Sequence, residues 1–271
     1  MKKIGHSILK NKKWEVPDFV IDEFARKKHK YVICVFVINE GEKLKKQIKE
    51  MQEYAKIIDI VIADGGSTDG SLEHEYLEKH KIRALLTKTG KGKLSAQMRM
   101  AFAWVLTEKY EGVITIDGNG KDDVSAIPDF IRKLDKGYDH IQGSRFIKGG
   151  KAVNTPIERL IAVKFIHAPI ISLASRRRHT DTTNGFRGYS AKLLADSKIS
   201  IFRDVFESYE LHYYLAIEAS RSQKYSVIEQ PVTRVYPKGK TPTKISPIKG
   251  NMKVIKILIE STTGKYKMRD K

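Results

Sequence analysis

The chain has 271 residues, enough to bury one substantial core, and its hydrophobic content of 41% is ordinary for a globular protein. Its 51 lysine and arginine residues outnumber 32 acidic residues, and the formal net charge of +19 favours a polyanionic partner such as nucleotide phosphates, a nucleic acid or an anionic membrane surface. The single cysteine, Cys34, excludes an intramolecular disulfide, and no apolar run predicts a membrane span or a signal peptide, so we expect a cytoplasmic protein.

The first half of the chain alternates between apolar runs and charged, amphipathic segments. Residues 1–30 mix many charges with scattered apolar side chains, and we expect a basic N-terminal extension that packs on the domain. The predicted strands cover residues 31–38, 57–63, 82–86 and 113–117, and the helices between them cover residues 40–54, 72–80 and 94–106. This alternation predicts an α/β fold, with a mostly parallel, doubly wound sheet in a single domain and helices on both faces.

The second half of the chain is less regular. We predict helices over residues 127–134, 206–219 and 251–260, strands over residues 138–142, 227–228 and 232–235, and a basic loop over residues 236–247. Residues 156–175 are largely apolar, but their charges rule out an ordinary membrane span. Three arginines follow, Arg176 to Arg178, and two interpretations stay open: a helix lying in the interface of an anionic membrane, or a core-packed helix with a solvated basic end.

A cluster of polar side chains follows the predicted strand 113–117. Asp117 ends this strand, and Asn119 and Asp122 come shortly after it. Ligands of open α/β sheets bind beyond the carboxyl ends of the strands, and carboxylate and amide oxygens suit Mg²⁺ or Mn²⁺, which can hold a diphosphate. By itself the segment favours a solvated, glycine-rich turn. Its interpretation as a binding site therefore depends on the motifs around it.

Several of those motifs stand in a characteristic order. They are Val37-Ile38-Asn39-Glu40, Ala63-Asp64-Gly65-Gly66-Ser67-Thr68-Asp69-Gly70, Gly90-Lys91-Gly92-Lys93, Asp117-Gly118-Asn119, and Gln142-Gly143-Ser144-Arg145 with Asp181 to Arg187. Their order resembles family 2 glycosyltransferases, which are inverting enzymes of GT-A-like fold, and most nearly the branch that loads polyprenyl or dolichyl phosphates. The resemblance implies a glycosyltransferase domain over residues 31–240, with a nucleotide-binding half (31–123) and an acceptor half (124–240), before a basic C-terminal loop and helix (241–271).

The resemblance also implies a donor site for a GDP- or UDP-sugar. Its expected residues are Asn39, Glu40, Asp64, Gly65, Lys93, Asp117, Gly118, Asn119, Arg234 and Lys240. Mg²⁺ or Mn²⁺ is expected on Asp117, Asn119 and Asp122. The sequence departs from the family pattern at Gly65 and Asn119, where relatives carry aspartates, and at Lys121, where they often carry glutamine. Two compensations are open: Asp122 supplies the missing carboxylate, or Lys121 binds the diphosphate directly.

On the acceptor side, the residues implied are Arg145, Asn184 and Arg187, because arginine pairs bidentately with phosphate oxygens. The expected catalytic group is Asp117, Arg145, Asp181 and Glu210. A general base is needed only if the acceptor is a hydroxyl, and Asp181 and Glu210 are then the candidates. Both residues have an alternative structural role as a helix cap or an ion pair.

We therefore expect an inverting glycosyltransferase that uses a nucleotide-diphosphate sugar and a polyprenyl phosphate, peripheral at the inner face of a membrane. One alternative is transfer to a sugar hydroxyl of a growing cell-surface glycan. An alternative of another class is a non-catalytic, basic nucleotide- or nucleic-acid-binding protein. Nucleic acid is not expected as a partner, because no RNA-binding motif with interleaved aromatic residues occurs and the lysines are scattered along the chain.

Overall fold

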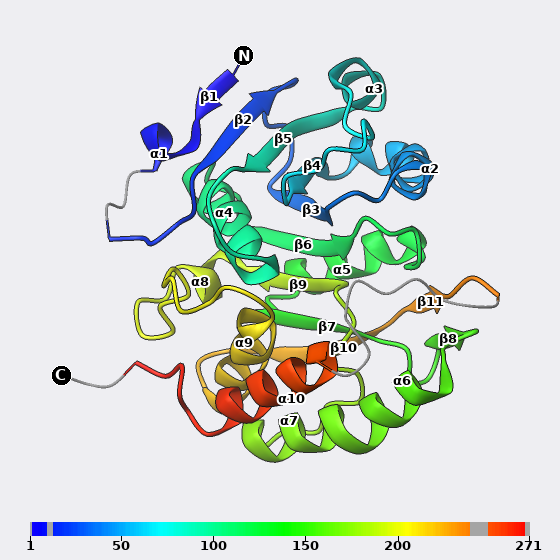
Figure 1. Cartoon of the computed structure of the whole chain (residues 1–271), viewed down its shortest axis with the longest axis vertical. Helices are drawn as coiled ribbons and strands as arrows, with labels where there is room; N and C mark the ends of the chain where they lie inside the picture. Colours follow the sequence, from blue (N-terminus) through cyan, green and yellow to red (C-terminus); the bar gives the residue numbers. More distant parts are fainter. Residues whose placement is uncertain (1, 10–12, 239–248, 269–271) are drawn as a thin grey trace.

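A nine-stranded sheet runs through the computed structural model, which describes residues 2–9, 13–238 and 249–268 (Figure 1). In spatial order its strands are β1 (Lys2–Ile4), β2 (Phe19–Glu23), β5 (Ile82–Lys88), β4 (Asp59–Asp64), β3 (Tyr31–Val37), β6 (Gly112–Asp117), β9 (Arg187–Ser190), β7 (His140–Ser144) and β10 (Val227–Pro231). Within this sheet β2 and β9 run opposite to the other strands. The prediction of a mostly parallel α/β sheet is confirmed.

The central strands are buried on both faces, as parallel strands covered by helices must be. Every residue of β3 is buried, and its side chains alternate: Val32, Cys34 and Phe36 enter one core, whereas Ile33 and Val35 enter the other. One face is covered by α2 (Glu42–Met51), α3 (His74–Lys79), α5 (Ile127–Asp135) and the short 3₁₀ turns η1 (Gln52–Lys56) and η2 (Val124–Ala126). The other face is covered by α1 (Gly5–Ile8), α4 (Leu94–Thr107), α8 (Ala191–Leu194) and α9 (Glu210–Arg221).

Helix α4 is enclosed on all sides because it lies between the sheet and α9. All residues from Ser95 to Val105 are buried. A helix in this position cannot have a polar face, and its sequence is accordingly apolar almost throughout. The same packing explains why the predicted helix over residues 94–106 is found with nearly unchanged bounds.

The predicted extension, residues 1–30, continues the sheet within its described part. β2 pairs antiparallel with β5, and β1 pairs with β2. Phe19 and Ile21 of β2 point into the core on the α4 side. The apolar residues Phe19 and Ile21 of this basic segment are therefore inward side chains of a strand that extends the sheet beyond β5.

The far end of the sheet carries a helical layer (Figure 1). It contains α6 (Ile157–Ile161), the π-helical segment η3 (Ala162–His167), α7 (Ala168–Ser175) and α10 (Lys249–Thr262), and α7 and α10 both pack on α9. Ile171 of α7 is buried against Tyr213, Ile217 and Ile257, while Leu173 is exposed. The interpretation of a core-packed helix is confirmed for the buried side of this segment, and the interpretation of a membrane-interface helix stays a prediction for its exposed side.

A two-stranded parallel sheet of β8 (Lys151–Val153) and β11 (Thr233–Val235) lies beside the carboxyl end of β6, to which an isolated bridge between Asp122 and Arg234 connects it. The predicted helix over residues 206–219 begins later, at Glu210. Much of the predicted loop 236–247, including Lys240, lies outside the described residues. Among the described helices, none is long and apolar enough to cross a membrane.

The burial of Phe19 makes the N-terminal segment a testable part of the core. We expect Phe19→Ala to lower the free energy of unfolding by about 3–5 kcal/mol, because it removes a fully buried aromatic ring. Ile4→Ala, at an exposed position of the same segment, is the matched control and should cost little. Urea denaturation measures both, and equal small effects would mean that residues 1–30 are not part of the cooperative core.

Candidate active site

Asp117 is placed by the end of β6 and by a tight turn that follows it. The Gly118 N–H donates to the carbonyl of Phe36 at 2.9 Å, and a Cβ on Gly118 would lie 2.4 Å from Val37 Cγ1, so only glycine fits. Gln47 of α2 clamps the same turn: its Nε2 donates to the Asp117 carbonyl at 3.0 Å. Its Oε1 accepts from the Gly120 N–H at 2.8 Å.

The sequence interpretation did not include Gln47. A signal for it was present, because Gln47 is a polar residue on the buried face of an amphipathic helix, between Leu44 and Ile48. A buried amide in such a position must find hydrogen-bond partners. Those partners, the main-chain atoms of the turn after β6, lie some 70 residues further along the chain.

The Asp117 carboxylate is partly exposed and lies close to the loop that contains Gly185. Its side chain is 32% exposed, and a Cβ on Gly185 would come within 2.5 Å of Oδ1, so the loop after Asp181 can pass only because residue 185 is glycine. Asn119 Nδ2 is 3.4 Å from Asp117 Oδ2. Burial and the nearby charge of Asp117 raise the pKa of Tyr209, which marks this tyrosine as a further neighbour of the site.

Arg234 joins the two carboxylates expected to bind the metal. Its Nη2 is 3.1 Å from Asp117 Oδ2, and its Nη1 pairs with Asp122 Oδ2. The bridge between the segments is supported by hydrogen bonds from Asp123 N to Thr233 O at 3.0 Å and from Val235 N to Lys121 O at 2.8 Å. Burial raises the pKa of Asp122, and the charge of Arg234 opposes that shift. Arg234 therefore contacts both ends of the predicted metal-binding segment.

This segment carries oxygen atoms of the kind that a hard divalent cation binds. Asp122 Oδ1 is buried and accepts no hydrogen bond from the described residues, and the carboxylate of Asp117 and the amide oxygen of Asn119 lie on the same turn. No group of three or more His, Cys, Asp or Glu side chains converges within the described part of the chain. Mg²⁺ and Mn²⁺ commonly take their remaining ligands from water and substrate phosphates, so Asp117, Asn119 and Asp122 are the residues that would hold such an ion here.

Tyr236 is surrounded by cations. The charged groups of Lys121, Arg159 and Arg234 lie 5.2, 5.6 and 5.7 Å from its ring centroid, within cation–π range. Burial by itself would raise the pKa of Tyr236, but Arg234, Arg145 and Arg159 lower it below its ordinary value. Tyr236 thus marks a place where positive charge from four parts of the chain converges.

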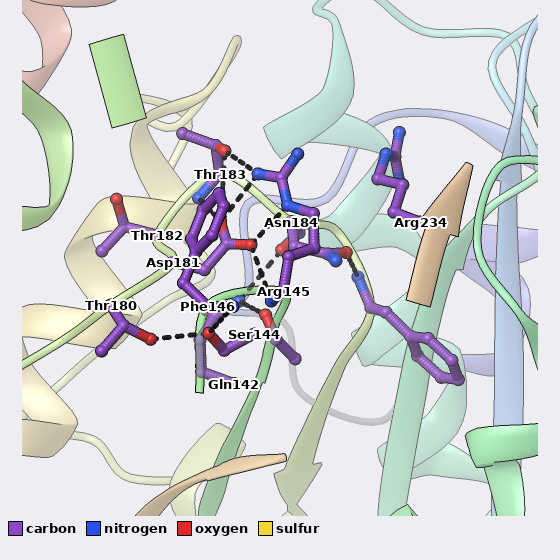
Figure 2. Close-up of polar contacts among 12 residues, drawn as sticks. Gln142, Ser144, Arg145, Phe146, Thr180, Asp181, Thr182, Thr183, Asn184 and Arg234 are labelled. Carbon is purple, nitrogen blue, oxygen red and sulfur yellow. Dashed lines mark hydrogen bonds and ion pairs between the residues drawn. The ribbon is translucent and has the colours of Figure 1, made fainter. Parts of the chain in front are cut away.

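Arg145 and Asp181 form a buried, bidentate ion pair (Figure 2). Arg145 Nε donates to Asp181 Oδ2 at 2.6 Å, and Nη2 donates to Oδ1 at 2.9 Å and to Thr183 Oγ1 at 3.0 Å. Burial opposes the charged guanidinium, but Asp181 outweighs this effect and raises the pKa of Arg145. The carboxylate of Asp181 is therefore engaged by Arg145, while Arg145 Nη1 makes no hydrogen bond to the described residues.

The two other predicted acceptor residues are bonded to their own loop and, in the case of Arg187, also to α9. Arg187 donates to the carbonyls of Asn184, His212 and Thr182 at 2.8–2.9 Å. Asn184 Oδ1 accepts from the Phe186 N–H at 2.8 Å. Both side chains are buried, so in this structure they shape the loop around Asp181 and Gly185.

Glu210 and Lys93 stand on either side of the contact between the loop before α9 and the start of α4. The Glu210 carboxylate accepts from the Ser208 N–H just before α9, so it stabilises the preceding loop, and the N-cap residue of this helix, Tyr209, makes no side-chain cap. Lys93 precedes α4, and its side chain is exposed. The main-chain N–H of Lys93 donates to the Glu207 carbonyl at 2.8 Å. The loop before α9 is thereby fixed on the N-terminus of α4.

The predicted donor residues at the ends of β3 and β4 are bonded to one another. Asp64 is buried and accepts from the N–H and the hydroxyl of Ser67 at 3.0 and 2.6 Å. Asn39 adopts a left-handed backbone with φ 48°, and its Oδ1 accepts from Thr68 N–H at 2.8 Å. Gly65 N–H donates to the carbonyl of Val37 at 2.8 Å, and Glu40 follows in the adjoining exposed turn.

Gln97 of α4 links the ends of β3 and β4, because its Nε2 donates to the carbonyls of Val37 at 3.0 Å and of Ala63. Lys88 is the last residue of the neighbouring strand β5, and its Nζ donates to the Gly90 carbonyl at 2.8 Å. Neither residue was predicted as part of the site.

Comparisons with known proteins bear on the family and the fold of the chain. The family profile described as Glycosyl transferase family 2 matches residues 32–209. Polyprenol monophosphomannose synthase of Mycolicibacterium smegmatis is 26% identical over 212 residues, which cover 77% of this chain and 78% of that protein. Undecaprenyl-phosphate mannosyltransferase of Micrococcus luteus is 27% identical over 203 residues, covering 73% of this chain and 80% of that protein.

Among solved structures, glucosyl-3-phosphoglycerate synthase of Mycobacterium tuberculosis, crystallised with Mn²⁺, uridine diphosphate and phosphoglyceric acid, superposes with a TM-score of 0.60. The match covers 89% of this chain and 79% of that one at 13% identity. This similarity establishes the shared fold and is consistent with a GT-A-like sheet.

The buried pair of Arg145 and Asp181 predicts a large effect on stability. Asp181→Asn keeps the size of the side chain but leaves a buried guanidinium without its counter-charge, and we expect the free energy of unfolding to fall by about 3–5 kcal/mol. Glu50→Gln, which removes an exposed pair with Lys46, is the control and should cost less than about 0.5 kcal/mol. Similar losses in the two variants, measured by urea denaturation, would contradict the buried-pair interpretation.

Proposed function

The chain belongs to glycosyl transferase family 2, and we propose that it transfers a sugar from a nucleotide-diphosphate sugar to the phosphate of a polyprenyl phosphate, at the surface of a membrane. The observation that carries this proposal is the cluster of cations beside Asp117. Lys121, Arg159 and Arg234 gather on Tyr236, and Arg145 lies near enough to influence its pKa. Such a cluster suits a site that holds the phosphates of both donor and acceptor.

The acceptor follows from what the carboxylates do. A hydroxyl acceptor needs a general base, whereas a phosphate monoester is already an anion at neutral pH. Both Asp181 oxygens accept from Arg145, and one carboxylate oxygen of Glu210 accepts from the Ser208 N–H. Both predicted bases thus already accept hydrogen bonds, which favours a phosphate acceptor over a sugar hydroxyl. The names of the two similar bacterial enzymes, which act on polyprenol and undecaprenyl phosphate, support the same choice.

The reaction is a single displacement with inversion. An acceptor phosphate oxygen forms a bond to the anomeric carbon, and the bond from that carbon to the donor diphosphate breaks, releasing the nucleoside diphosphate. Arg145 and Arg159 hold and orient the acceptor phosphate, while Arg234 stands where the charge of the leaving diphosphate develops. Mg²⁺ or Mn²⁺, held by Asp117 and Asn119 with Asp122 behind them, would supply further positive charge at the leaving group.

The helical layer beside this site has the surface of a membrane-binding face. Ile157, Ile161, Phe165 and Leu173 are 68%, 50%, 73% and 85% exposed, and follow one another along α6, η3 and α7. Met252, Ile255 and Ile259 are the exposed apolar residues of the neighbouring α10. Exposed basic residues accompany them: Lys164, Arg176, Arg178, Lys253 and Lys256. Apolar groups among cations are typical of helices that lie on anionic membranes.

The π-helical segment η3 helps to keep the apolar residues on one side. Ile157, Ile161, Phe165 and Leu173 are spaced in multiples of four residues. In a regular α-helix each step of four residues turns about 40° too far, because 3.6 residues complete a turn. The wider turns of a π-helix reduce this drift. This row of exposed apolar residues begins next to Arg159, whose guanidinium contacts Tyr236. A lipid held at this face would therefore have its phosphate near the cation cluster.

The experiment that tests the function measures release of GDP, UDP or CDP from a panel of sugar nucleotides, with a short polyprenyl phosphate as acceptor and Mn²⁺ or Mg²⁺ present. We expect turnover with at least one donor, and we expect Asp117→Ala to abolish it without unfolding the protein, because Asp117 is a partly exposed site residue. Asp123→Ala removes an exposed carboxylate nearby and should retain activity. Full activity of Asp117→Ala would refute the proposed site.

The membrane-binding face predicts a dependence on anionic lipid. The full chain should float with phosphatidylcholine vesicles that contain phosphatidylglycerol and much less with phosphatidylcholine alone. Phe165→Glu and Leu173→Glu should each reduce flotation severalfold, because they place a carboxylate at an exposed apolar position. Ile4→Glu, at an exposed apolar position on the opposite end of the sheet, is the matched control. Unchanged flotation of the two helix variants would rule out this face.

A further inference from the structure

The cation cluster contains more positive charge than the carboxylates around it can balance. Arg145 pairs with Asp181, and Arg234 pairs with both Asp117 and Asp122. Lys121 and Arg159 contact the ring of Tyr236, but neither makes an ion pair with a carboxylate in the described ranges 2–9, 13–238 and 249–268.

The position of Lys121 beside Tyr236 is fixed by hydrogen bonds of its main chain. Its N–H donates to Asn119 Oδ1 at 3.3 Å, and its carbonyl accepts from Val235 N–H at 2.8 Å. Its ammonium is 5.2 Å from the centroid of the Tyr236 ring. The residue is partly buried, and a partly desolvated ammonium without a counter-ion favours a site that an anion completes.

The same geometry weakens the case for a strongly bound divalent cation. Asn119 contributes an amide oxygen but no charge, and both nearby carboxylates are already neutralised in part by Arg234. A metal ion at Asp117 would also be repelled by Arg234 and Lys121. The fixed side chains therefore provide part of the positive charge that a divalent cation would otherwise provide.

We propose that Lys121, together with Arg234, binds the diphosphate of the donor directly and makes donor binding less dependent on a divalent cation. This inference rests on the proposed function, since it takes the donor to be a nucleotide-diphosphate sugar. Phosphate is also the recognition group of the proposed acceptor, and Lys121 is assigned to the donor because it follows the Asp117–Asn119 turn directly.

Calorimetric titration of the full chain with GDP, UDP and CDP, in EDTA and in Mn²⁺, tests the assignment. We expect the wild-type chain to bind one nucleotide in EDTA within about tenfold of its affinity in Mn²⁺, because two protein cations remain. Lys121→Gln should weaken binding about tenfold in EDTA and clearly less in Mn²⁺, whereas Lys121→Arg should retain binding. Lys43→Gln removes an exposed lysine on the other side of the same turn and is the matched control.

Two further measurements separate the outcomes. Binding of Mn²⁺ to the nucleotide-free chain, followed by electron paramagnetic resonance, should strengthen severalfold in Lys121→Gln and stay unchanged in Lys43→Gln. Equal weakening of nucleotide binding with and without Mn²⁺, or a rise only in the KM for a short polyprenyl phosphate, would overturn the assignment of Lys121 to the donor. A wild-type chain that binds none of GDP, UDP and CDP under any condition would instead refute the proposed function itself.

Discussion

The bridge from Arg234 to Asp117 and Asp122 is the interaction on which the site depends. Two carboxylates this close would repel each other in a partly buried opening, and the guanidinium between them removes most of that repulsion. The bridge also connects two segments more than 100 residues apart, because it fixes β11 against the turn after β6. Tyr236 is the residue directly after β11, so the position of the cation cluster around its ring also depends on the bridge made by Arg234.

Charge pairing also explains which chemistry the site can perform. Each carboxylate expected to act as a base has a structural partner: Asp181 orients Arg145, and Glu210 begins α9. Cations, in contrast, are present in excess around Tyr236. A site with occupied carboxylates and unpaired cations binds anions well and removes protons poorly, and phosphate chemistry requires only the first of these abilities.

Much of the fold follows from local sequence, but only part of the site does. Runs of β-branched residues such as those of β3 and β6 predicted the central strands, and Asp117 was predicted from its place at a strand end. Gln47, Gln97 and Tyr209 could not be assigned in this way, because their roles depend on contacts with segments far along the chain. Arg187 has the right residue type for phosphate, yet its donors are taken by carbonyls that only the folded loop brings near.

The helical layer links this site to the lipid that we propose as its acceptor. A soluble sugar acceptor would gain nothing from a stripe of exposed apolar residues next to the site, and water makes such a stripe unfavourable. A polyprenyl phosphate has an apolar tail and an anionic head. The protein has a matching surface for each: exposed apolar residues on α6 for the tail, and Arg159 beside Tyr236 for the head. The end of the chain adds to the same face through α10, which packs on α9 beside α7. Under the proposed function, membrane binding and acceptor recognition would be two consequences of one arrangement, because the helical segment with the exposed apolar residues also carries the guanidinium that contacts Tyr236.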